Sequence, residues 1–140
     1  MKKRILIPID LEHEPVFDGL FATALEFLDP DTSEIMLLTI VPQLHLGYFP
    51  SIEHRYMQKL IAETQRRLDA LGHERLGDGY NWQTQVEAGD PKKRILNSAD
   101  AQNVQLIVLA SHNPRNSDII FGSVAAYVVR HAHRSVLVVR

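Results

Sequence analysis

Five apolar segments, separated by longer amphipathic stretches, dominate the hydrophobic pattern of the chain. They lie at residues 5–9, 34–41, 81–88, 104–110 and 135–140. Four of them are nearly continuous apolar runs, which are typical of strands buried on both faces in a parallel sheet. The segment at 81–88 instead alternates Trp82, Thr84 and Val86 with polar residues, which predicts an edge strand with one face in solvent.

The stretches between these segments have helical spacing. Apolar residues between Val16 and Leu28 form a broad stripe, with Pro15 suited to the first turn of a helix. A long helix is predicted from Ile52 to about Leu71, followed by a loop that begins at Gly72. Two shorter helices are predicted, one starting at Pro91 with Asp90 as its N-cap, and one from about residue 123 to 132.

Strands and helices therefore alternate from one end of the chain to the other. This order predicts an α/β fold, a single domain over residues 1–140 built on an open parallel sheet with right-handed crossovers. Five strands joined by four helices leave room for no separate linker or second domain.

Composition narrows the possible partners. The 140 residues are 45% hydrophobic and 23% charged, with a formal net charge of −2. This balance gives no electrostatic footprint for nucleic acid or an anionic membrane, and no apolar run approaches the ~20 residues of a membrane span. The chain has no cysteine, which excludes disulfides and thiol chemistry. We expect no nucleic-acid or membrane partner and a cytoplasmic location.

Candidate chemistry lies where two predicted strands end. The first ends at Pro8-Ile9-Asp10 and the fourth at Ala110-Ser111-His112-Asn113. If these strands are neighbours, Asp10 faces the polar loop that follows the fourth strand, across the kind of crevice that binds ligands in open α/β sheets.

The end of that loop offers a place for an anion. Gly122 and Ser123 would present backbone N–H groups at a helix N-terminus, where Ser123 could also act as N-cap, and Arg115 could add a charged contact. On spacing alone, an ordinary helix start and an ordinary turn at Asp10 explain these residues better than a phosphate site does.

Seven histidines raise the question of a metal site. His131 and His133 are two residues apart near a helix end, so they point in different directions. Polar groups near the last carbonyls of a helix explain them better than metal ligation does. We expect no metal site.

Several stretches resemble the universal stress protein family: ILIPID at 5–10, AGDPKKRIL at 88–96, and the last 35 or so residues, above all FGSVAAYVVRHAHRSVLVV. The resemblance covers the whole chain. It implies a Rossmann-like, five-stranded sheet in the order 3-2-1-4-5 with helices on both faces. It also implies a homodimer through the C-terminal strand, Ser135 to Arg140, which would otherwise be an exposed apolar edge.

The resemblance also implies a nucleotide site. Members that bind ATP carry Gly, two residues, Gly, nine residues and then Gly-Ser or Gly-Thr. Here Ala110 and Asn113 stand at the two glycine positions, eight residues separate Asn113 from Gly122, and Gly122-Ser123 matches fully. Alanine adds one methyl group, and asparagine is the residue besides glycine that best tolerates positive φ.

The family's site residues map onto this sequence as expectations. Pro8 and Asp10 would line the adenosine end, and Ile40 would contact adenine through its backbone. The remaining expected cofactor-binding residues form the floor and the phosphate end: Leu109, Ala110, His112, Asn113, Arg115, Gly122, Ser123 and Val124. Mg²⁺ could accompany ATP, although no dedicated carboxylate cage for it is evident.

The resemblance implies a dimeric, ATP-binding sensor or regulator in the stress response. No residue is placed to activate a water on the γ-phosphate, so we expect no catalytic residues and at most slow hydrolysis. The alternative is a nucleotide-free universal stress protein that acts as a protein-interaction module. The glycine count of the loop is intermediate between the two.

Overall fold

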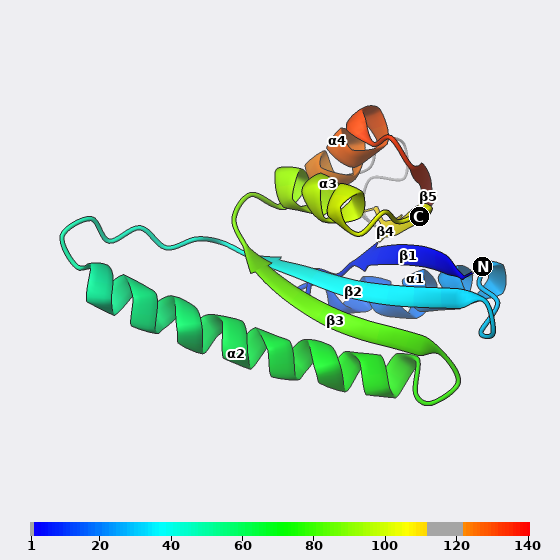
Figure 1. Cartoon of the computed structure of the whole chain (residues 1–140), viewed down its shortest axis with the longest axis horizontal. Helices are drawn as coiled ribbons and strands as arrows, with labels where there is room; N and C mark the ends of the chain where they lie inside the picture. The colour runs from blue at the N-terminus through cyan, green and yellow to red at the C-terminus, as the bar shows by residue number, and fades with distance from the viewer. Residues whose placement is uncertain (1, 112–121) are drawn as a thin grey trace.

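The computed structural model describes residues 2–111 and 122–140. Strands and helices alternate along the chain as the hydrophobic pattern predicts (Figure 1). The elements are β1 (Lys3–Pro8), the 3-10 turn η1 (Glu14–Val16), α1 (Phe17–Phe27), β2 (Ser33–Val41), α2 (Pro50–Arg75), β3 (Asn81–Ala88), α3 (Pro91–Ala101), β4 (Leu106–Ala110), α4 (Ser123–His131) and β5 (Ser135–Val139).

All five strands belong to one parallel sheet in the order β3-β2-β1-β4-β5. In the centre of the sheet, Ile5 of β1 is paired with Ile35 of β2 and Leu106 of β4. The order confirms the expected 3-2-1-4-5 arrangement. It places the ends of β1 and β4 side by side, at the point where the direction of strand order reverses.

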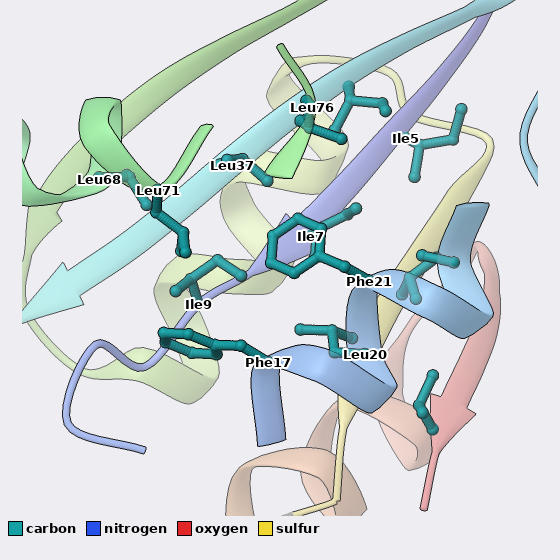
Figure 2. Packing of buried hydrophobic residues seen from close by; sticks show 14 of the residues in the cluster. Ile5, Ile7, Ile9, Phe17, Leu20, Phe21, Leu37, Leu68, Leu71 and Leu76 are labelled. Carbon is teal, nitrogen blue, oxygen red and sulfur yellow. The ribbon is translucent and has the colours of Figure 1, made fainter. Parts of the chain in front are cut away.

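Each face of the sheet is covered by two helices. Ile5, Ile7 and Leu37 belong to one core cluster, together with side chains of α1 and α2 such as Leu20 and Leu68 (Figure 2). Because successive side chains of a strand point to opposite faces, the residues between them belong to the other cluster. That cluster contains Leu6, Met36 and Ile107 with side chains of α3 and α4. Burial on both faces explains why these strands are continuously apolar.

Two expectations about the helices are wrong in detail. Pro15 lies in η1, one turn before α1, rather than in the first turn of the helix itself. Helix α2 continues past Leu71 to Arg75, so Gly72 is a helical residue and not the start of a loop.

The buried position of Gly72 has a packing reason. Trp82 of β3 lies against it, so closely that an added Cβ at residue 72 would come within 2.3 Å of the indole ring. Trp82 also donates its Nε1–H to the carbonyl oxygen of Gly77 at 2.8 Å. The prediction of a packing role for Trp82 on an edge strand is therefore confirmed, while Gln83 on the opposite face is exposed.

Candidate functional site

A cavity of about 380 Å³ opens at the carboxyl ends of β1, β2 and β4. This is the edge of the sheet where open α/β folds bind ligands, and the volume lies within the usual range of small-molecule sites, about 300–1,000 Å³. Residues from both helical layers complete it, including Phe17 and Leu20 of α1, Leu60 of α2 and Ile95 of α3. The walls are mostly apolar, with a few polar groups that could orient a ligand.

Six of the residues expected at a nucleotide site line this cavity: Pro8, Asp10, Ile40, Leu109, Ala110 and Val124. They come from four different elements or from the residues that directly follow them, so only the sheet order brings them together. The structure shows that these six residues lie around one cavity. Which part of a nucleotide each would contact stays a prediction.

The start of α4 adjoins the cavity. Gly122 occupies the N-cap position with φ −53° and ψ 165°, and no side chain among the described residues caps the helix there. Ser123, expected as a possible N-cap, is instead the first helical residue and is exposed. Val124 and Ala125, one residue further, line the cavity. The first N–H groups of a helix have no partner within the helix and favour negative charge, so this end of the cavity suits an anionic group.

Three expected residues, His112, Asn113 and Arg115, lie outside the described residues. Of the departures from the glycine pattern, Asn113 and the shortened spacing to Gly122 fall among these residues, whereas Ala110 is the last residue of β4. Whether Asn113 adopts positive φ there stays a prediction.

The carboxylate of Asp10 is held by its own loop. Oδ1 accepts a hydrogen bond from the backbone N–H of Glu12 at 3.0 Å, and Oδ2 lies 2.8 Å from Nδ1 of His13. The backbone N–H of His13 also donates to the carbonyl of Asp10 at 3.0 Å. These contacts close a tight turn directly after β1 and fix the side chain at the cavity wall.

Helix α2 contributes two polar residues that the sequence analysis did not name. Thr64 and Arg67 both line the cavity. Arg67 reaches the β1–α1 connection, with Nη1 3.1 Å from Oε1 of Glu12 and Nη2 donating to the carbonyl of Leu11 at 3.3 Å. Residues three and four apart share a helix face, so the positions Leu60, Thr64 and Arg67 could have indicated a common wall.

The far wall is formed by the start of α3. Asp90 accepts a hydrogen bond from the N–H of Lys92 at 3.1 Å, which confirms the predicted N-cap. Before it, Gly89 has φ 140°, a conformation that side chains rarely adopt, and donates its N–H to the carbonyl of Val41 at 2.9 Å. This turn places Pro91 at the cavity.

The described residues contain neither a metal-binding cluster nor a membrane-spanning helix. Over residues 2–111 and 122–140, no group of three or more His, Asp or Glu side chains is arranged to hold a metal ion. Within the same part of the chain, none of the helices has the length and apolar character needed to cross a membrane.

Comparisons with known proteins converge on one family. The model of the universal stress protein family matches residues 1–140. Universal stress protein G of Shigella flexneri is 31% identical over 143 positions, which cover 100% of both chains. The structure of MJ0577 from Methanocaldococcus jannaschii has a TM-score of 0.81 at 25% identity, covering 99% of this chain and 96% of that one. A family member from Arabidopsis thaliana with AMP bound has a TM-score of 0.63 at 18% identity, covering 98% and 90%.

Proposed function

Because this chain belongs to the universal stress protein family, we propose that it binds ATP in the cavity at the carboxyl ends of β1, β2 and β4. In this proposal it acts as a dimeric sensor or regulator of the stress response, with little or no hydrolysis. The proposal also assigns it to the cytoplasm, where ATP is available as a signal. The observation that carries it is one cavity with apolar walls, Asp10 on one side and the start of α4 on the other.

The arrangement of the cavity supports an adenine nucleotide. Apolar side chains such as Ile40 and Leu109 offer flat contacts for a purine, and the Asp10 carboxylate can accept hydrogen bonds from ribose hydroxyls. The uncapped N–H groups at the start of α4 suit the phosphates. The AMP-bound Arabidopsis protein, which shares the fold, supports the same class of ligand. Mg²⁺ would then reach the site with the nucleotide, since ATP brings its own oxygen ligands.

The contacts of the two carboxylates at the cavity, Asp10 and Glu12, support the proposal that ATP hydrolysis is slow at most. Asp10 contacts His13, and Glu12 contacts Arg67. Both carboxylates thus contact basic side chains and stabilise the β1–α1 connection. In this proposal neither acts as the general base that activates a water molecule.

The proposed dimer uses the edge of the sheet. Strand β5 pairs with β4 on one side and ends the strand order at that edge. An antiparallel pairing of the segment Ser135 to Arg140 with that of a second copy would complete the hydrogen bonding of this edge. Sedimentation should then give twice the chain mass of 15.9 kDa. A monomer at micromolar concentration would contradict the proposal.

The direct test of nucleotide binding is chemical identification. The purified protein is denatured, any released nucleotide is identified by mass spectrometry, and the ligand-free protein is titrated calorimetrically with ATP and Mg²⁺. A saturable signal at micromolar to millimolar ATP is expected. Absence of both released nucleotide and binding heat would refute the proposal.

One surface favours the alternative, a nucleotide-free interaction module. The start of α2 extends beyond the carboxyl ends of β2 and β3 (Figure 1). Four large apolar side chains are exposed on and just before it: Tyr48, Phe49, Ile52 and Tyr56. Exposed groups of this kind often mark protein contacts. If the titration fails, substitution of these side chains is the next experiment.

A further inference from the structure

The position of Asp10 is fixed first by the sheet. The preceding residue, Ile9, donates its N–H to the carbonyl of Leu38 at 2.7 Å, and its own carbonyl accepts from the Thr39 hydroxyl at 3.0 Å. Ile9 and Thr39 are both buried. The backbone on the N-terminal side of Asp10 is therefore tied to β2.

The side chain of Asp10 is oriented by contacts with the following turn. The backbone N–H of Glu12 donates to Oδ1, and Nδ1 of His13 lies 2.8 Å from Oδ2. An ionised carboxylate can only accept, so a hydrogen bond to it requires the proton of His13 on Nδ1. These two contacts, one at each oxygen, restrain both the position and the rotation of the carboxylate plane.

The turn that carries His13 is itself braced. Arg67 of α2 contacts the side chain of Glu12 and the carbonyl of Leu11, at 3.1 Å and 3.3 Å. The side chains of Asp10 and His13 are each 46% exposed. The carboxylate is therefore held in a defined orientation and is still accessible from the cavity that it lines.

We propose that His13 is a positioning residue that makes this site select nucleotides with free ribose hydroxyls. Asp10 lines the cavity, where its carboxylate oxygens can accept hydrogen bonds from a ligand. Held in one plane, its oxygens can accept from the two neighbouring hydroxyls of a ribose together. Without His13, Oδ2 loses this contact with the turn and the orientation of the carboxylate is less restrained. The inference rests on the proposed nucleotide function and adds to it a specificity for the sugar.

The test compares two ligands on four proteins. ATP and 2′,3′-dideoxy-ATP, each with Mg²⁺, are titrated calorimetrically into the wild type, His13→Ala, His13→Asn and His54→Ala. The asparagine amide nitrogen is attached at the same carbon as Nδ1, so it can donate to Oδ2 in place of the imidazole. His54 is exposed on α2 and does not line the cavity, so its replacement is the matched control.

The expected result is a loss that depends on the sugar. His13→Ala should weaken ATP binding about three- to fivefold, the upper range for a partly exposed charged contact, and leave binding of the dideoxy nucleotide unchanged. His13→Asn should restore most of the ATP affinity, and His54→Ala should match the wild type. In an Asp10→Ala background, His13→Ala should have no further effect, because the two residues act through one contact.

The possible failures are distinguishable. An equal loss for both nucleotides would mean that His13 only stabilises the loop, and no loss for either would mean that it does not act on the ligand. Either result overturns the positioning role and leaves the nucleotide site intact. If the wild type binds neither nucleotide, the proposed function fails and the role of His13 fails with it.

Discussion

Replacing Gly72 by alanine tests how α2 and β3 are packed. Glycine within a helix is ordinarily unfavourable by about 1 kcal/mol relative to alanine, so an alanine would stabilise α2 if there were space for it. There is none, because the new Cβ would lie 2.3 Å from Cζ3 and 2.6 Å from Cη2 of Trp82. Two contacts restrain the indole ring. Its Nε1–H donates to the carbonyl oxygen of Gly77, and the ring packs against His73 in a T-shaped arrangement with a centroid distance of 4.9 Å.

The expected magnitude is the difference between two opposing effects. Forcing an extra methyl group into a packed core typically destabilises by about 1–3 kcal/mol. The gain in helix propensity offsets about 1 kcal/mol of this, and displacement of the indole also weakens its bond to Gly77. We therefore expect Gly72→Ala to lower the free energy of unfolding by about 1–2 kcal/mol. For a chain of this size that is a decrease in Tm of roughly 3–6 °C.

Chemical denaturation followed by circular dichroism measures this change, and two further variants make it specific. Among the described residues, nothing beyond the backbone of α1 itself and the adjacent residues lies within 4 Å of a Cβ added at Gly19, so Gly19→Ala should be neutral or stabilising. In a Trp82→Leu background, Gly72→Ala should stabilise, because the clashing ring is gone. If Gly72→Ala stabilised the wild type as Gly19→Ala does, the packing argument would be refuted.

The remaining predictions concern two helix starts. Gly122→Asp should abolish ATP binding, with affinity lowered at least tenfold by titration, because it places a carboxylate beside the expected phosphates; unchanged affinity would place the phosphates elsewhere. The same variant should keep or raise Tm, since φ at Gly122 is −53° and aspartate is a favourable N-cap. Asp90→Ala should lower the free energy of unfolding by about 1 kcal/mol through loss of the cap on α3. Asp90→Ser, which keeps an acceptor for the Lys92 N–H, should lower it by clearly less, and an equal loss in both variants would contradict the capping role.

Local chemistry in the sequence was enough to predict most of the fold. The continuous apolar run from Ile5 to Ile9 predicted a strand covered on both faces, and the structure buries Ile5 and Ile7 against one layer and Leu6 against the other. Asp90 followed by Pro91 predicted the start of α3, because a carboxylate acceptor and a residue without an N–H suit the first turn of any helix.

The end of α2 shows where such local inference fails. Gly72 looked like a helix terminator because glycine disfavours helices when nothing else acts on it. A contact with Trp82, distant in the sequence and adjacent in space, reverses that preference. The same limit explains why Thr64 and Arg67 were not named as cavity residues, since nothing in α2 alone says which side faces the end of β1.

The sequence by itself determined the α/β class, the strand and helix order, and the residue types available at the ends of the strands. Those properties depend on hydrophobic periodicity and on backbone chemistry, which involve residues close to one another in the sequence. Only the tertiary structure decided that Asp10, Ile40, Ala110 and Val124 surround one cavity, and that His13 and Arg67 hold the turn beside it. Those relations depend on which strands lie side by side and which helix faces meet them, and contacts between distant segments exist only once the whole sheet has formed.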